Sequence, residues 1–101
     1  MDELIKRNAL PVPVVQKEVA AIWAARGYSC NLFVDPPGQE WLNFVHDCNE
    51  LVSVVEGRLD MDIGDASFIV EPGDEVFIPK GARHSLRNIH PGISKWLYGY
   101  D

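Results

Sequence analysis

Three side chains in this sequence have the types and spacing that can hold a metal ion: His46, Glu50 and His84. His46, Cys48 and Glu50 stand two residues apart, so in a straight strand they would share one face. At ~3.3 Å per residue, His46 and Glu50 would then lie about 13 Å apart, too far to share one ion. A shared ion therefore requires a chain reversal at residues 47–49, which begin and end with turn-forming side chains. This reversal is expected to place His46 and Glu50 side by side on neighbouring strands.

The third ligand is expected from a later strand. His84 follows the turn at residues 79–81, and in a strand His84, Leu86 and Asn88 share one face while Arg87 points the other way. Two imidazoles and one carboxylate suit Fe, Mn, Zn, Ni or Cu and leave positions free for a substrate or dioxygen. The sequence therefore predicts one divalent metal ion bound by all three. The alternative is a metal-free barrel that keeps a relic of the site.

The surrounding sequence predicts mostly strands. Residues 1–13 have no clear periodicity and are interpreted as an N-terminal arm, and residues 14–101 as a single domain. Residues 14–26 are predicted to form a helix, because Val15, Val19, Ile22 and Trp23 recur with helical spacing. Short β-prone runs between turn residues predict eight strands, at 28–35, 40–46, 50–56, 59–63, 67–70, 75–78, 84–88 and 95–100. This pattern predicts an all-β jelly roll with one N-terminal helix outside it.

A set of fixed spacings joins the two parts of the predicted site. Gly73 is followed after five residues by Pro79-Lys80-Gly81, which is followed after two residues by His84. Three further residues separate His84 from Asn88. Three and six residues separate His46, Glu50 and Gly57. The first series resembles the second conserved motif of the cupin superfamily at every position, and the second series resembles part of its first motif. The resemblance implies a double-stranded β-helix barrel that holds a metal through His46, Glu50 and His84.

One position departs from the family pattern. Many metal-binding cupins carry a further histidine two residues before the one matched by His46, and this chain has Phe44 there. The usual four-ligand site is therefore not expected, which leaves three ligands or a weaker site. Cys48 is a less favoured replacement, whose thiolate would favour Zn, Fe or Cu. Cys48 is otherwise expected in the turn, and Cys30 in the core.

Several other residues are expected to play structural roles. His90 precedes a Pro-Gly turn and is not expected to be a ligand. Arg83 and Arg87 are expected to point outward and pair with surface carboxylates, and the acidic residues Asp60, Asp62 and Asp65 to form a solvated hairpin face. The aromatic residues are expected chiefly in the core, with some lining a pocket: Trp41, Phe44, Phe77, Trp96, Tyr98 and Tyr100.

Composition and charge exclude some functional classes. A net charge of −6 disfavours binding to the negatively charged phosphate backbone of a nucleic acid, so no nucleic-acid partner is expected. The longest apolar run, residues 19–25, is too short to cross a membrane, and no secretory signal is recognised, so a cytoplasmic location is expected. The two cysteines, with no Cys-x-x-Cys pair, are expected to stay reduced.

These observations leave two functions open. The first is a metal-dependent enzyme acting on a small organic molecule, most plausibly an oxygenase with Fe or Mn, in which Glu50 alternatively acts as a base. The second is a non-catalytic ligand-binding or sensing module with a structural metal or none. A homodimer is expected in either case, because small barrels often pair their edge strands.

Overall fold

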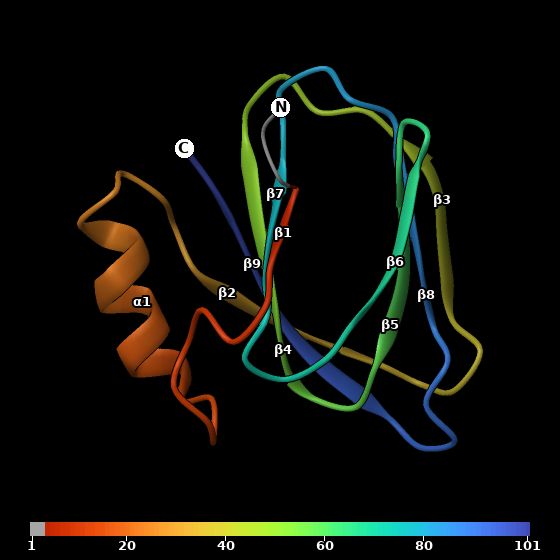
Figure 1. Cartoon of the computed structure of the whole chain (residues 1–101), viewed down its shortest axis with the longest axis horizontal. Coiled ribbons are helices and arrows are strands. Elements are labelled where there is room, and N and C mark those ends of the chain that lie inside the picture. Colours follow the sequence, from red (N-terminus) through yellow and green to blue (C-terminus); the bar gives the residue numbers. More distant parts are fainter. Residues whose placement is uncertain (1–3) are drawn as a thin grey trace.

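The computed structural model describes residues 4–101 as two antiparallel sheets that face each other, with one helix outside them (Figure 1). The five-stranded sheet has the order β1 (Ile5–Lys6), β7 (Glu75–Ile78), β4 (Glu50–Glu56), β9 (Ser94–Tyr100) and β2 (Asn31–Asp35). The four-stranded sheet has the order β3 (Glu40–Phe44), β8 (His84–Asn88), β5 (Leu59–Ile63) and β6 (Ala66–Val70). The prediction of an all-β jelly roll with one helix is confirmed.

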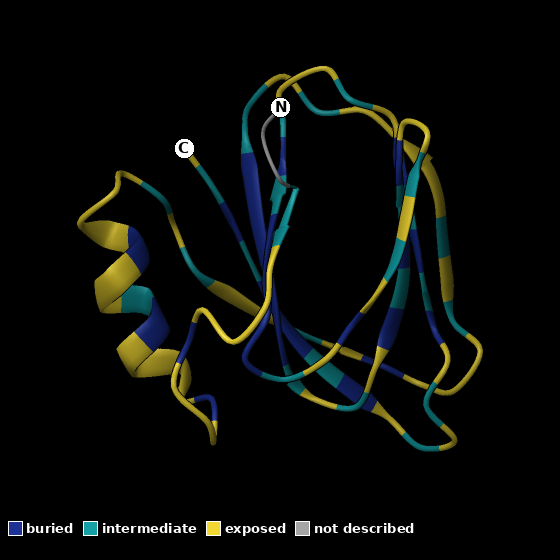
Figure 2. Ribbon diagram, in the orientation of Figure 1, coloured by how far each residue is buried: buried dark blue, intermediate teal, exposed yellow. Residues whose placement is uncertain are grey.

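Side-chain alternation along the strands determines which residues fill the space between the sheets. In β5, Leu59, Met61 and Ile63 are buried while the two aspartates between them are half-buried, as expected of a strand with one face toward a core. The central strand β4 is instead buried on both faces (Figure 2). Its Val52 and Val54 belong to the core between the sheets, whereas Leu51 packs on the helix side. The five-stranded sheet therefore separates two cores.

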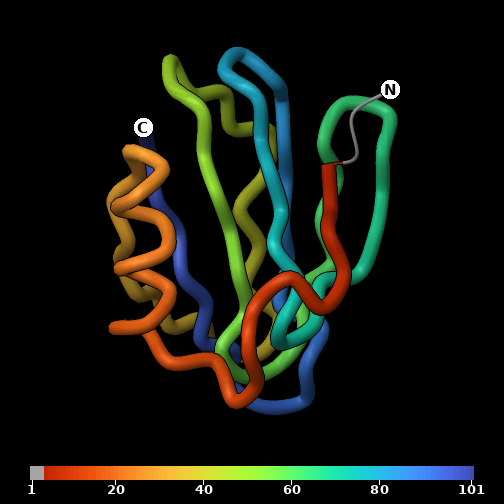
Figure 3. The backbone as a smooth tube through the Cα atoms, turned by 60° about the vertical axis from the view of Figure 1, so that its left-hand side comes forward, coloured from red at the N-terminus to blue at the C-terminus, as the bar shows by residue number. Residues whose placement is uncertain are grey.

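The helix α1 (Gln16–Ala24) covers the outer face of the five-stranded sheet, beside β9 (Figure 3). Only part of the predicted apolar face is used: Val19 and Trp23 are buried, while Val15 and Ile22 remain 44% and 39% exposed. Polar contacts fix the rotation of the helix, because the Trp23 indole N–H donates to Glu75 Oε1 at 2.8 Å. The helix predicted over residues 14–26 is present but shorter at both ends. Among the described residues, no helix has the length and apolar character needed to cross a membrane.

The N-terminal arm contains a strand that the sequence did not reveal. Ile5 and Lys6 pair with Val76 and Glu75 at the edge of the five-stranded sheet, and this two-residue strand lies within the predicted arm. Residues 1–3 of that arm lie outside the described residues. The eight predicted strands are all present, and four of their ends differ from the prediction. β2 begins at Asn31 rather than at 28, β3 ends at Phe44 rather than at 46, and β6 and β9 each begin one residue earlier than predicted.

Candidate metal centre

The reversal predicted at residues 47–49 is present, and it carries the chain from one sheet to the other. His46 lies just beyond β3, and Glu50 is the first residue of β4. Because β3 and β4 belong to different sheets, the prediction that the two ligands lie on neighbouring strands was wrong. The crossing places His46 opposite Glu50 at one end of the space between the sheets. The two side chains are therefore close together although their strands are not paired.

Backbone hydrogen bonds hold this crossing loop. The Gly81 N–H donates to the His46 carbonyl at 2.9 Å, and the Lys80 N–H donates to Asn49 Oδ1 at 2.8 Å. The Asn49 side chain also donates to Asp101 at 2.9 Å. The loop that carries His46 is therefore fixed against the turn that leads to His84.

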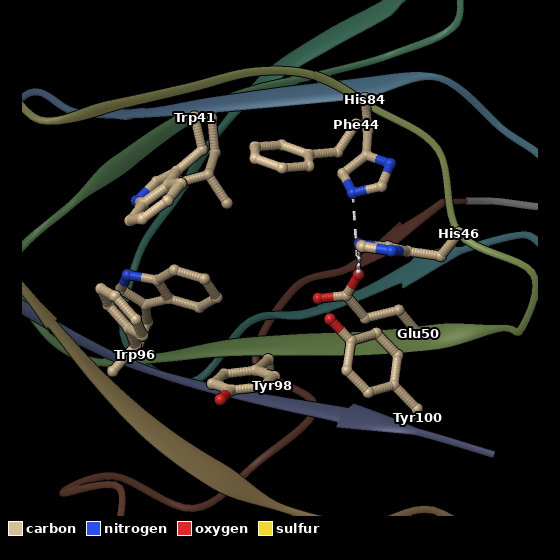
Figure 4. A pocket seen from close by; sticks show the side chains of 10 residues that line it. Trp41, Phe44, His46, Glu50, His84, Trp96, Tyr98 and Tyr100 are labelled. Carbon is tan, nitrogen blue, oxygen red and sulfur yellow. Dashed lines mark ion pairs between the residues drawn. The ribbon is translucent and has the colours of Figure 1, made fainter.

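The three predicted ligands converge. Glu50 Oε1 lies 3.4 Å from His46 Nε2 and 3.7 Å from His84 Nε2, as the dashed lines in Figure 4 mark. All three candidate ligand atoms lie within 4.8 Å of one another. Both contacts with the carboxylate are longer than the 2.7–3.2 Å of an ordinary N–H···O hydrogen bond. The group is thus close enough to share an ion, yet it does not form a tight hydrogen-bonded triad.

The orientation of His84 makes its Nε2 available as a ligand. His84 is 5% exposed, and its Nδ1 lies 3.1 Å from the Ala82 carbonyl oxygen. A carbonyl only accepts, so Nδ1 carries the proton and Nε2 presents its lone pair toward Glu50. Burial lowers the pKa of His84, with the neighbouring His46 acting in the same direction and the Ala82 hydrogen bond opposing it. The neutral imidazole that a metal requires is therefore the favoured form.

Glu50 is a buried carboxylate, and one of its oxygens lacks a hydrogen-bond partner. The residue is 4% exposed, and Oε1 has no hydrogen-bond partner within residues 4–101. Burial raises its pKa from 4.5 to about 7. An unpaired buried carboxylate is costly, and binding a cation is one of the few ways to compensate that cost.

This arrangement fits the ion that the sequence predicts. Ligand atoms bonded at about 2.0–2.2 Å to one tetrahedral ion lie roughly 3.4 Å apart, close to the distances between Glu50 and the two histidines. The set offers two imidazole nitrogens and one carboxylate oxygen as ligand atoms. His46, Glu50 and His84 therefore match a divalent cation in chemistry and in separation.

Phe44 and Cys48 differ in how they relate to this group. The Phe44 ring stacks on His46, with ring centroids 6.2 Å apart and 17° between the planes, and lies 6.4 Å from His84. The position of the expected fourth histidine is thus occupied by a ring that packs on the other two. Cys48 is half-buried and does not belong to the group of atoms within 4.8 Å. The structure does not support Cys48 as the replacement ligand.

The three ligand residues line one end of a cavity of about 210 Å³ between the sheets. The rest of its lining is almost entirely aromatic: Phe33, Trp41, Phe44, Leu86, Trp96, Tyr98 and Tyr100. Of the aromatic residues predicted chiefly as core, five therefore line the cavity, while Phe77 packs on the helix side of the sheet. Burial raises the pKa of Tyr100 to about 12, with the nearby Glu50 contributing in the same direction, so its hydroxyl stays protonated.

Sequence reasoning missed Asp35. This residue is 1% exposed, and it accepts hydrogen bonds from the indole N–H of Trp41 at 3.2 Å and of Trp96 at 2.8 Å. Trp96 lies 61 residues from Asp35, and Trp41 lies six residues away but on a strand of the other sheet, so no local pattern indicated either contact. The sequence placed Asp35 only at the end of a predicted strand, before two prolines.

The residues expected to be structural lie away from the site. Arg87 points outward and pairs with Asp60 at 2.7 Å, and also with Glu40 and Asp62, as predicted. Arg83 is exposed. His90 lies in the turn between β8 and β9, where its backbone N–H donates to Asn88 Oδ1, and it is not part of the metal-ligating group.

The chain was compared with known proteins. Residues 31–100 match the sequence family described as "Cupin domain". A cupin 2 domain-containing protein from Halorhodospira halophila is 23% identical with a TM-score of 0.68, over 73% of this chain and 52% of that one. An oxalate oxidase in complex with the substrate analogue glycolate is 23% identical with a TM-score of 0.67, over 74% and 42%.

A third solved structure, of a DMSP lyase, is 26% identical with a TM-score of 0.66, over 72% of this chain and 37% of that one. The chain spans about half the length, or less, of these three relatives. No curated protein sequence matches it. The match over residues 31–100, together with the jelly-roll fold that carries both motifs, shows that this chain belongs to the cupin superfamily.

Proposed function

We propose that this protein is a metal-dependent enzyme that acts on a small organic molecule in the cavity between its sheets, with one divalent ion held by His46, Glu50 and His84. The observation that carries the proposal is the buried, unpaired Glu50 Oε1 facing two imidazole nitrogens at the end of a ligand-sized cavity. Its most specific form is an oxygenase that uses Fe or Mn.

A bound divalent ion would supply Lewis acidity to a substrate oxygen and, if redox-active, a means of reacting with dioxygen. The protein would supply the rest. Three ligands from one loop and two strands leave part of the coordination sphere free. The walls of the cavity are largely aromatic, and Phe44 covers one side of the two histidines. The protonated Tyr100 hydroxyl, directed toward Glu50 in Figure 4, offers a hydrogen-bond donor there.

Two of the similar structures support a small-molecule substrate. One is an oxalate oxidase crystallised with glycolate, and another is a DMSP lyase. Fold alone does not choose a chemistry, so these relatives support the class of ligand rather than the reaction.

A second candidate is a non-catalytic module that binds or senses a small molecule. It is favoured by one observation: apart from the predicted ligands and the two tyrosine hydroxyls, the cavity-lining residues within 4–101 offer no acid, base or nucleophile. In this case the metal would be structural or dispensable.

Metal analysis followed by oxygen-uptake assays would separate the two candidates. Untagged protein is loaded with Fe²⁺ or Mn²⁺ and tested with phenols and diketones. If the protein is an enzyme, oxygen uptake should depend on the metal. His84→Ala should abolish this uptake while the variant remains folded, as measured by circular dichroism. Ligand binding that is unchanged in metal-free protein, with no turnover of any compound, would favour the module.

The homodimer and the cytoplasmic location remain predictions from the sequence. For the dimer, the outer face of the edge strand β2 exposes Leu32 and Val34, at 45% and 47%. Size exclusion at several concentrations tests it, and a monomer at every concentration would exclude it.

A further inference from the structure

The end of the cavity away from the three ligands is built around a buried carboxylate. Asp35, at the end of β2, is 1% exposed and accepts hydrogen bonds from two cavity-lining tryptophans, Trp41 and Trp96. Among the described residues, no basic side chain pairs with it. The carboxylate therefore serves as the common acceptor of the two indole N–H groups.

These hydrogen bonds determine which part of each indole faces the cavity. Figure 4 shows the nitrogen atoms of Trp41 and Trp96 on the side away from the three ligands, with the ring carbons toward the cavity. Phe33 completes this wall, with its ring 5.3 Å from that of Trp41 and 5.6 Å from that of Trp96. Because both N–H groups are engaged by Asp35, neither indole offers a free donor to the cavity.

The opposite end is polar. It carries the two histidines, Glu50 and the Tyr100 hydroxyl, whereas the Tyr98 hydroxyl points away from the histidines in Figure 4. None of the cavity-lining residues in the described part of the chain is Lys or Arg. A ligand that fits would place an oxygen at the polar end and an uncharged, apolar body at the other.

The size of the cavity limits that body to a single ring. A cavity of 150 Å³ accommodates benzene, so about 210 Å³ accommodates one ring with a small substituent. Walls made of ring faces and edges favour a flat, aromatic partner.

We infer that Asp35 is a specificity-determining positioning residue: by engaging both indole N–H groups it keeps the remote end of the cavity apolar, so the ligand is an uncharged, single-ring molecule of the phenol class with its oxygen at the metal end. This inference rests on the proposed function for the orientation of the ligand. A carboxylate behind the apolar wall also disfavours a negatively charged tail.

The test is a calorimetric titration of three ring compounds of similar shape into protein saturated with Zn²⁺, which supports binding without redox turnover. The compounds are 4-methylphenol, hydroquinone and 4-hydroxybenzoate, which differ only in the group at the remote end. The wild type is expected to prefer 4-methylphenol over each of the others by about tenfold or more, because a polar group would lose its water there without a partner.

The Asp35→Asn variant is expected to reduce this preference over hydroquinone to less than about threefold. The amide offers one acceptor oxygen where the carboxylate offers two, and it carries no charge, so both indole N–H groups are held less firmly. An indole can then turn its N–H toward the remote hydroxyl. Adding Trp41→Phe removes the indole with the longer hydrogen bonds and is expected to restore the preference. A merely structural role for Asp35 would not predict this rescue.

Glu75→Gln is the matched control, because Glu75 accepts the Trp23 indole N–H on the outer side of the same sheet, away from the cavity. Its ligand preference is expected to equal that of the wild type. Wild-type protein that binds hydroquinone or 4-hydroxybenzoate as tightly as 4-methylphenol, or that binds none of the three, would overturn the inference. A folded Asp35→Asn variant that keeps the full preference would also overturn it.

Failure of the metal site gives a separate result. If wild-type protein takes up no Zn²⁺, the proposed function fails, and the same three compounds are titrated into metal-free protein, where the apolar wall predicts the same order. If Asp35→Asn does not fold, the wild-type series alone decides whether the remote end is apolar.

Discussion

The two ends of the cavity each contain a buried carboxylate, and the fold provides for them in opposite ways. Asp35 is surrounded by donors from two indoles. Glu50 faces two imidazole nitrogens and has an oxygen with no partner. Both are nearly inaccessible, at 1% and 4% exposure. Burial alone therefore does not distinguish the two carboxylates, whereas the absence of a hydrogen-bond donor at Glu50 Oε1 does.

Other buried carboxylates in the described chain resemble Asp35. Glu75 accepts from Trp23 and Arg26, and Asp74 accepts from Arg7 and from two backbone N–H groups. These residues connect elements of the fold. Glu50 is the exception, and a bound cation would compensate the free energy cost of burying it.

The largest expected effect is on metal affinity at the Glu50 end. His84→Ala removes one of three ligands and should weaken Zn²⁺ binding by more than about 100-fold, because even indirect partners of metal ligands cost 10- to 100-fold. Competition with a chromogenic chelator measures this. His90→Ala, in the β8–β9 turn, is the control and should bind like the wild type. Equal affinity in both variants would show that the ion, if bound, lies elsewhere.

The second effect is a gain in stability when the unpaired charge is removed. Burial raises the pKa of Glu50 from 4.5 to about 7, so the metal-free wild type loses stability as pH rises through this range. Glu50→Gln carries no such charge. The free energy of unfolding of the variant relative to wild type should therefore rise by up to about 3 kcal/mol between pH 4.5 and pH 8.

Urea denaturation of both proteins in the presence of a chelator measures this difference. Any contribution of His84 titration that is the same in both proteins cancels when the wild-type free energy of unfolding is subtracted from that of the variant. A difference that does not change with pH would mean that Glu50 is already compensated in the metal-free protein.

The same type of substitution at the other end should have the opposite sign. Asp35→Asn leaves one acceptor oxygen for two buried indole N–H groups and removes the charge that strengthens their hydrogen bonds, which should lower the free energy of unfolding by about 1–3 kcal/mol at pH 8. Denaturation under the conditions used for Glu50→Gln gives the comparison. Equal shifts of the same sign in the two variants would remove the distinction between the two ends.

A smaller effect is the pH dependence of metal binding. Below pH 7, Glu50 must lose a proton before it can bind, so the Zn²⁺ dissociation constant should increase by a factor approaching ten per pH unit. The lowered pKa of His84 keeps that ligand neutral over much of this range. Titrations at pH 8, 7 and 6 test this. Zn²⁺ dissociation constants that differ by less than about threefold across these pH values would be inconsistent with a protonated Glu50.

The sequence alone predicted the fold class and the three converging residues. The strands were visible because β-branched and aromatic runs end at Gly, Pro, Asn and Asp, and the reversal at residues 47–49 followed from the distance between His46 and Glu50 along a strand. These signals are local, or depend on a fixed spacing.

What the sequence did not reveal depends on contacts between distant elements. Which sheet receives β4 after the reversal is decided by its pairing with β7 and β9. The rotation of α1 depends on Glu75, and the role of Asp35 on indoles from β3 and β9. No periodicity records such contacts. The two-residue strand β1 likewise depends on the edge that β7 offers.

The most direct test of the unpaired carboxylate is metal content. Untagged wild type, Glu50→Gln and the outer-face control Glu75→Gln are purified in parallel, dialysed against low concentrations of Fe²⁺, Mn²⁺ and Zn²⁺, and measured by elemental analysis. The account predicts about one divalent ion per chain in the wild type and in Glu75→Gln, and less than a tenth of that in Glu50→Gln. A wild type that retains no metal, or a Glu50→Gln variant that retains as much as wild type, would contradict it.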